Sequence, residues 1–259
     1  MKIFLITILT FLFFGFESNK PLKLKDLYGT WIDDSLYSEM LVSKSPYKSV
    51  KYIYNIKWLE LKDSSWLHWY DEALPYKSDS LSENIIKLKC VNSEYDLNIN
   101  VLNDSTLSYT DFIEHKKVIL KKFNYYTQGF KNCDNEIPYY YYIKSKYFKG
   151  RKKLCRVEDK SKISIVNFIS TCEVDGFLNY SNYRLFAGGI ENTPNLDILV
   201  LETIKGKSYS FNYEISGDSI YIYHFKNKIS GKNQDLLEYL DFLDSKLIKG
   251  KLLYILTDN

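Results

Sequence analysis

Proline and glycine are scarce in this chain, with 5 and 11 residues respectively among 259. Collagen-like and low-complexity chains contain far more of both. Hydrophobic residues make up 45% of the sequence and charged residues 26%, which is the balance of a chain that buries a core. We therefore expect a globular protein with one large domain or two ordinary ones.

Histidine is also rare, and the motifs of several enzyme classes are absent from the sequence. The three histidines are His68, His115 and His224, and none lies in the H-E-x-x-H motif of zinc proteases. Residues 206–208 (Gly-Lys-Ser) lack the earlier glycine of a phosphate-binding loop, and no G-x-S-x-G motif occurs. We expect no enzyme, no metal and no cofactor. A metal site built from distant strands and a hydrolase or isomerase activity stay open as alternatives.

Charge of one sign never accumulates in a long block. The chain has 35 basic and 32 acidic residues, a net charge of +3, and its basic clusters are as short as GRKK at 150–153. A nucleic-acid-binding protein concentrates its basic residues on one face. We therefore expect no nucleic-acid partner.

Long apolar runs are missing everywhere except at the N-terminus. Lys2 precedes the almost unbroken apolar residues 3–16, and polar residues 17–20 follow. This order is typical of a secretory signal, and the run is short for a membrane-spanning helix. We expect residues 1–18 to be a signal peptide and the protein to be exported, either periplasmic or secreted. The alternative is an uncleaved anchor, which alone would place the chain at a membrane.

Four cysteines remain, Cys90, Cys133, Cys155 and Cys172, and none forms a C-x-x-C pair. An even number in an exported chain permits disulfides. We expect Cys90–Cys133 and Cys155–Cys172, because cysteines close in sequence meet most often. Buried free thiols are the alternative.

Tyrosine is the residue in clear excess, with 24 copies in an aromatic share of 17%, and it favours β-strands. In residues 50–58 five of the apolar side chains share one parity, which predicts a strand with one buried face; they are Val50, Tyr52, Tyr54, Ile56 and Trp58. Asn103-Asp104 predicts a tight hairpin turn. Further strands are expected at 85–91, 95–102, 105–112, 116–123, 139–148, 161–170, 196–204, 208–215, 218–225 and 251–258.

One segment has a helical rather than an alternating pattern. Leu236, Leu240, Leu243 and Leu247 are spaced by four, three and four residues, which predicts one helix near the C-terminus. Gly250 follows as its end signal.

The two halves of the chain resemble each other. The segment DLYGTWID around Gly29 parallels YFKGRKKL around Gly150, although Lys152 stands where the first half has a tryptophan. A repeat of this length indicates two copies of one domain rather than a solenoid. We expect domains at 22–123 and 139–259, joined by a linker at 124–138.

The pattern Leu27-x-Gly29-x-Trp31, placed just after the signal and followed by a meander of strands, resembles the start of the lipocalin-like, or calycin, superfamily. The chain is similar to the small lipocalin-like modules that bacteria export, whose activity is unassigned. The resemblance implies an all-β fold of two tandem antiparallel barrels. It implies structural roles for Gly29, which lets the first strand enter tightly, and for Trp31, which packs across the closed end of the barrel.

The cluster WLHWYDE at 66–72 is the densest group of site-like side chains. On a strand, Trp66, His68 and Tyr70 share one face while Asp71 lies on the other, so an ordinary strand is favoured over a catalytic or metal site. The residues we expect to contact a ligand are Tyr52, Tyr54, Trp58, Trp66 and Tyr70.

The sequence therefore supports two non-enzymatic functions. The first is binding of a small apolar or amphipathic ligand inside a barrel lined by residues 50–58 and 161–168. The alternative is an envelope interaction or inhibitor module with filled barrels, whose partner is a protein. A cavity of a few hundred Å3 inside a barrel would favour the first function, and a solid interior would favour the second.

Overall fold

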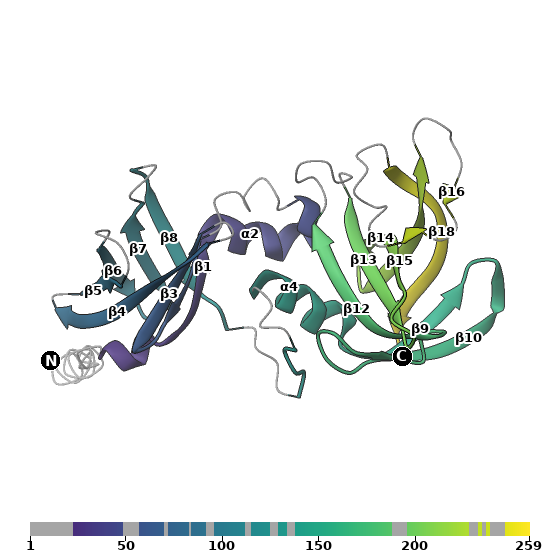
Figure 1. Ribbon diagram of the computed structural model, residues 1–259, viewed down its shortest axis with the longest axis horizontal. Helices are drawn as coiled ribbons and strands as arrows, with labels where there is room; N and C mark the ends of the chain where they lie inside the picture. The colour runs from purple at the N-terminus through teal and green to yellow at the C-terminus, as the bar shows by residue number, and fades with distance from the viewer. Residues whose placement is uncertain are drawn as a thin grey trace, which may run out of the picture.

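The computed structural model describes residues 23–48, 57–69, 72–82, 84–91, 96–111, 115–124, 129–133, 138–187, 196–227, 233–234, 237–238 and 247–259. Two antiparallel β units follow one another along the chain (Figure 1). The expectation of an all-β fold with two barrel-like units is confirmed. The expected signal peptide, residues 1–18, lies outside the described residues.

The first unit is a closed barrel of eight strands in sequence order, in which β8 returns to pair with β1. Each strand pairs with the next one along the chain, as expected for a meander. A tight turn joins β6 to β7 one residue later than predicted, because Asn103 pairs with Thr106 and the turn residues are Asp104 and Ser105. The strands are β1 (Gly29–Asp33), β2 (Lys57–Leu61), β3 (Ser64–Trp69), β4 (Glu72–Ser82), β5 (Ile85–Cys90), β6 (Leu97–Asn103), β7 (Thr106–Thr110) and β8 (Lys117–Lys122).

The second unit is a ten-stranded sheet in the order β11-β10-β9-β18-β15-β14-β13-β12, with β16 pairing with β15 and β17 with β14. The two ends of this path meet, because Glu173 beside β11 bridges to Asn182 of β12. The unit is therefore barrel-like. Its strands are β9 (Gly150–Arg156), β10 (Asp159–Phe168), β11 (Val174–Asp175), β12 (Tyr180–Ala187), β13 (Asp197–Thr203), β14 (Ser208–Ser216), β15 (Ser219–Asn227), β16 (Asn233–Gln234), β17 (Leu237–Glu238) and β18 (Leu247–Asp258).

Both units begin in the same way, with a short helical segment, a glycine of positive φ and then the first strand. The 3-10 helix η1 (Leu24–Leu27) leads to Gly29 at φ 139°, and the π-helix η2 (Lys144–Phe148) leads to Gly150 at φ 85°. Positive φ is the conformation that glycine adopts without strain. This shared entry supports the internal repeat seen in the sequence.

The third residue of each first strand lies opposite the end of the last strand of its unit. Trp31 pairs with Lys122, whose ammonium group lies 5.4 Å from the centre of the indole ring. Lys152 pairs with Asp258, and its buried side chain forms an ion pair with the exposed carboxylate of Asp258. The lysine that replaces the tryptophan in the second half is thus matched by an acidic partner.

Both interiors are filled by large side chains. In the first barrel Trp31, Tyr76 and Tyr109 pack with aliphatic residues in one cluster to which all eight strands contribute. In the second, the ring of Phe148 stacks on Tyr183 at 5.7 Å between ring centres and meets the edge of Tyr213 at 5.8 Å. Buried aromatic pairs of this kind add to the stabilisation that comes from area burial.

The helix α2 (Asp34–Ser43) is inserted between β1 and β2, and in Figure 1 it runs from the first barrel toward the second. Asp33 caps it by accepting hydrogen bonds from the N–H groups of Ser35 and Leu36. Leu36 of α2 joins one buried cluster with residues of the second barrel. Ile32 and Trp58, which face each other across β1 and β2, belong to the same cluster. The two barrels therefore share a core.

The structure corrects one prediction and tests only the ends of another. Residues 139–148, expected as a strand, form α4 (Pro138–Ile143) and η2. In the segment expected as a helix over Leu236–Leu247, Leu237–Glu238 form β17 and Leu247 begins β18, so these residues lie in strands. Leu236 and residues 239–246 of that segment lie outside the described residues. The described helix of the second half is α4, at its start rather than near the C-terminus.

The predicted disulfide pairing is also wrong. The bond joins Cys133 to Cys172, with 6.0 Å between their Cα atoms. Cys90 and Cys155 take part in no disulfide. Tertiary contacts decide this pairing: the Cys133 N–H donates to Thr171 Oγ1, and the buried Lys144 ammonium group donates to the Thr171 carbonyl. The fold therefore brings Cys133 beside Cys172, whereas Cys90, the predicted partner of Cys133, lies in the first barrel.

Candidate functional site

A pocket of about 340 Å3 lies where the end of α2 meets the second barrel. One wall is the segment 43–48, which continues α2. The other wall is formed where β13 begins and β14 ends, by Leu196 before β13, Asp197 at its start and residues 212–216 of β14. The size lies in the range of pockets that hold small molecules.

The segment 43–48 is held in place by contacts at Lys44. This residue ends α2 in the left-handed conformation, at φ 54°. Its ammonium group donates to the carbonyl of Gly217, at 2.9 Å, and lies 5.1 Å from the ring centre of Tyr147. Lys44 therefore connects the segment after α2 to the second unit and also forms part of the pocket wall.

Asp197 is the most perturbed carboxyl group at this pocket. Its Oδ1 accepts a 2.6 Å hydrogen bond from the N–H of Tyr47. Burial raises the pKa of Asp197 to about 7, and the repulsion of Glu214 adds to this rise. Hydrogen bonds from Ser45 and Tyr47 and the nearby positive charge of Lys48 lower the pKa in part. The carboxyl group is thus poised to titrate near neutral pH.

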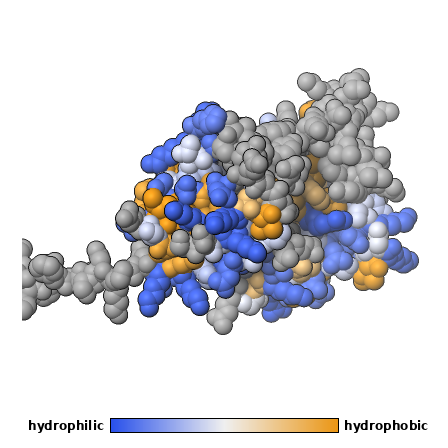
Figure 2. Space-filling model, turned by 60° about the vertical axis from the view of Figure 1, so that its left-hand side comes forward, coloured by the Kyte–Doolittle hydropathy of each residue, from blue (hydrophilic) through white to orange (hydrophobic). Residues whose placement is uncertain are grey.

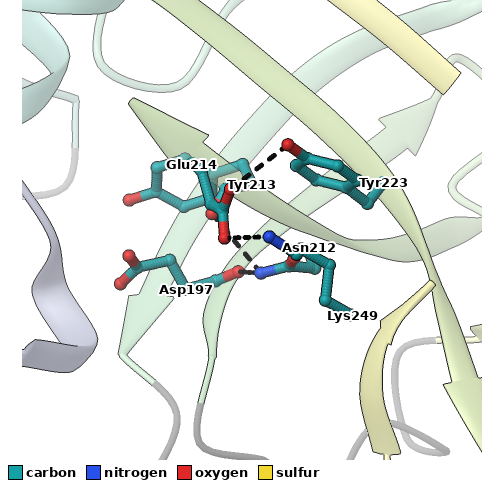
Figure 3. Close-up of polar contacts among 6 residues, drawn as sticks. All are labelled: Asp197, Asn212, Tyr213, Glu214, Tyr223 and Lys249. Carbon is teal, nitrogen blue, oxygen red and sulfur yellow. Dashed lines mark hydrogen bonds and ion pairs between the residues drawn. The ribbon is translucent and has the colours of Figure 1, made fainter. Parts of the chain in front are cut away.

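Asn212 supports Asp197 from β14, as Figure 3 shows. Its side-chain NH2 group donates to the carbonyl of Asp197 at 2.9 Å and to that of Tyr213 at 3.4 Å. Asn212 is only 1% exposed, and its Oδ1 atom accepts no hydrogen bond from any described residue. A buried acceptor without a donor costs free energy, so it is an expected contact point for a bound group.

Glu214 lies next along the same face of β14 and is held by two side chains (Figure 3). Tyr223 donates to one carboxylate oxygen at 3.2 Å, and Lys249 donates to the other at 2.7 Å. Burial, followed by the negative charge of Glu214, raises the pKa of Tyr223 to about 12. Tyr223 therefore stays protonated and remains a donor at neutral pH.

The pocket offers recognition chemistry. Its lining combines hydroxyl, amide, carboxyl and ammonium groups with the apolar side chains of Leu196 and Ile215, and the described residues of the lining include no cysteine or histidine. Within the described ranges, no group of three or more His, Cys, Asp or Glu side chains is arranged to hold a metal ion. The arrangement suits reversible binding of a polar molecule.

Gly29 and Trp31, the two residues expected to have structural roles, both lie in β1. Trp31 is fully buried in the first barrel, and its Nε1–H donates to the carbonyl of Leu27 at 2.9 Å. This hydrogen bond ties the indole ring to η1, at the end of the barrel where the chain enters. Gly29 has the positive φ described above.

The expected ligand-contacting residues do not meet inside the first barrel. Trp58 points outward into the core shared by the two barrels, and Trp66 is 37% exposed on the outer surface. Their neighbours Leu59 and Leu67 point inward instead. Tyr52, Tyr54 and Tyr70 lie outside the described residues, so their roles stay predictions.

Sequence reasoning missed Asp197 and Asn212. The available signal was the position of each: Asp197 begins an otherwise apolar strand, and Asn212 interrupts the aromatic run of β14. Both positions are unusual for polar residues in buried strands.

No helix within the part of the chain that the structure describes is long and apolar enough to cross a membrane. Comparison with protein-family models, curated proteins and solved structures finds no match to this chain.

Proposed function

We propose that the protein is an exported, non-enzymatic interaction module of lipocalin-like architecture that acts through its outer surface. The observation that carries the proposal is that both barrel interiors are occupied by the protein's own side chains. Rings such as Trp31, Tyr76 and Phe148 fill the space in which a carrier holds an apolar ligand. This geometry favours the filled-barrel alternative over a ligand inside a barrel.

A row of apolar side chains on the outer face of the second barrel supports a role in protein binding. Ile163, Cys155, Ile255 and Tyr221 are direct cross-strand neighbours on β10, β9, β18 and β15. Ile163 is 62% exposed, and Ile165 beside it is also exposed. On the face seen in Figure 2, the coloured hydrophobic residues are interspersed with hydrophilic ones. A continuous apolar row is typical of an interaction site.

The basic residues beside this row indicate the charge expected on the surface of the partner. Arg151 and Lys153 of β9 lie opposite Asn167 and Ile165, and both are exposed. Neither forms an ion pair with another described residue. A complementary partner is a protein surface with an apolar centre and an acidic rim on that side.

The disulfide supports export. Cys133–Cys172 crosslinks two loops of the second unit, and such bonds persist in oxidising compartments. Export itself rests on the N-terminal pattern and stays part of the proposal.

The experiment uses the thiol of Cys155 as a reporter of the surface. The full chain is incubated with an extract of its source cells, crosslinked, and labelled with a maleimide, and labelling of each cysteine peptide is quantified by mass spectrometry. Cys90, a partly buried thiol of the first barrel, is the internal control. We expect a partner to protect Cys155 and leave Cys90 reactive. The variant Ile163→Asp removes this protection, whereas Lys62→Gln on the first barrel retains it.

Native mass spectrometry of the same protein tests the competing function. An apolar molecule that is retained in the native state and lost on denaturation, with equal labelling of Cys90 and Cys155, would overturn the proposal. It would identify the protein as a carrier with a ligand inside a barrel.

A further inference from the structure

We propose that the pocket between residues 43–48 and β14 binds a small zwitterion, with its ammonium group at Asp197 and Asn212 and its acidic group at Lys48. The ligand class is a free amino acid, a dipeptide or a molecule of the same two-charge chemistry. This inference goes beyond the interaction module, since it concerns a small molecule in the pocket and not a protein on the apolar row, although Tyr221 of the row pairs with the pocket residue Glu214.

The ammonium side of the pocket is built by acceptors on the barrel wall. The Asp197 carboxylate has accepting capacity beyond the hydrogen bonds from Tyr47 and Ser45. Asn212 lines the same pocket, and its Oδ1 receives no hydrogen bond from the described side chains or main chain. An ammonium group has three donors and satisfies both acceptors at once. The amide orientation is fixed by the two carbonyl groups that accept from the side-chain NH2.

The acidic group of the ligand faces the opposite wall. Lys48 lines the pocket, is exposed, and makes no ion pair with any residue in the described ranges. The charge of Lys48 acts on Asp197, so the two groups are close enough for one small molecule to reach both. Lys44 is already engaged by Gly217 and Tyr147, which leaves Lys48 as the cation for an incoming carboxylate.

The charge balance of the pocket favours a zwitterion over a simple cation or anion. A ligand with one charge would pair with only one of Lys48 and Asp197, whereas a zwitterion pairs with both. A volume of about 340 Å3 suits one amino acid or a dipeptide. Leu196 and Ile215 supply an apolar wall for its side chain.

Binding is expected to depend on pH through Asp197. The other charged or titratable groups lining the pocket are Lys44, Tyr47, Lys48, Tyr213 and Glu214. An ammonium group binds the ionised carboxyl more strongly than the neutral one, and burial holds the pKa of Asp197 at about 7. Affinity for L-leucine should therefore rise from about pH 6 to about pH 8.

Isothermal titration calorimetry on the full chain tests the proposal with four matched probes. L-leucine and glycyl-L-leucine carry both charges, N-acetyl-L-leucine lacks the ammonium group, and L-leucinamide lacks the carboxylate. We expect both zwitterions to bind at least about tenfold more tightly than either single-charge probe near pH 7. Glycerophosphoethanolamine, a lipid headgroup with the same two charges, is titrated in parallel. Tighter binding of this probe than of leucine would assign the zwitterion to a lipid source.

Two variants test which side chain binds each charged group of the ligand. Lys48→Gln should reduce the affinity for L-leucine to that for leucinamide, and Asp197→Asn should reduce it to that for N-acetyl-leucine and abolish the pH dependence. Lys62→Gln, an exposed change on the first barrel, should bind as the wild type does. Circular dichroism and urea unfolding establish that each variant is folded.

Three results would overturn the inference. They are the absence of heat for every zwitterion at millimolar concentration, equal affinity for the charged and blocked probes, or wild-type affinity in both variants. None of them affects the maleimide test of the apolar row, so failure here and failure of the interaction module are distinguishable.

Discussion

The main-chain N–H of Tyr47 donates a 2.6 Å hydrogen bond to the carboxyl group of Asp197, 150 residues further along the chain. Tyr47 belongs to the segment after α2, and Asp197 opens β13. The bond therefore joins an insertion of the first barrel to the second barrel. It also places a buried, titrating group at the contact between them.

The stability of the protein should depend on the protonation of Asp197. Its pKa rises from an ordinary 3.8 to about 7 in the folded chain. Between about pH 4 and pH 7 the folded state holds a proton that the unfolded state has released, so the free energy of unfolding falls as pH rises. The decline from this group is of the order of 4 kcal/mol and ends above about pH 7.

Urea unfolding of the wild type and Asp197→Asn across this pH range measures the effect. The amide cannot titrate but keeps an oxygen that accepts from Tyr47. We expect the variant to lack the decline, so that the two curves converge or cross as pH rises. Parallel curves would show that Asp197 titrates normally.

Removal of the Trp58 ring should destabilise both barrels together. Trp58 is 8% exposed and packs in the core that the two units share. Trp58→Ala should cost about 3–5 kcal/mol, the usual cost of deleting a buried aromatic side chain. Trp66→Ala is the matched control, because Trp66 lies on the solvent side of β3, and it should change stability by less than about 1 kcal/mol. Equal costs in urea unfolding would contradict the shared core.

Loss of the Cys133–Cys172 bond should lower stability through the loop that it closes. The cysteines are 39 residues apart in sequence, and a loop of this length corresponds to about 3–4 kcal/mol. The double variant Cys133→Ser and Cys172→Ser should show this loss, and a reducing agent should reproduce it in the wild type. Cys90→Ser and Cys155→Ser should stay sensitive to the reducing agent. Insensitivity of the wild type would argue against the bond.

Gly176→Ala should be far more damaging than an ordinary turn substitution. A Cβ atom at Gly176 would lie 2.4 Å from the carbonyl oxygen of Ile165, and the backbone has a φ of 74°. We expect a loss of about 2–4 kcal/mol in thermal or urea unfolding. Gly206→Ala has nearly the same φ, 77°, with open space around the added methyl group. It should cost only about 1 kcal/mol, and a similar loss at both sites would show that backbone strain alone is responsible.

Alternation along the chain was sufficient to predict most of the strands. Leu97, Ile99 and Val101 of β6 are buried in the barrel, while the residues between them are exposed. This alternation can be recognised in the sequence without tertiary information. The pattern failed at residues 139–148, where tyrosines favour strands intrinsically. There every residue of 138–148 except Tyr140 and Lys146 is buried, so burial does not alternate, and packing against the second barrel outweighs β-propensity.

The candidate site was not predictable from local pattern. Its two walls are separated by about as many residues as a whole domain, and no motif links Lys48 to Asp197 or Asn212. Trp58 shows the same limit: its alternation with Leu59 identifies two faces of a strand, but only the arrangement of the barrels shows that both faces are buried. Disulfide pairing failed for a related reason, since proximity in sequence did not report proximity in the fold.

The insertion of α2 between β1 and β2 has a consequence for the order of events during synthesis. The first barrel closes when β8 is complete at Lys122, long before the ribosome reaches the strands that cover Ile32, Leu36 and Trp58. The nascent chain therefore carries an uncovered apolar face for the time needed to make most of the second half. A fragment cut after the first barrel would keep that face permanently, and we expect it to aggregate although its own sheet is closed.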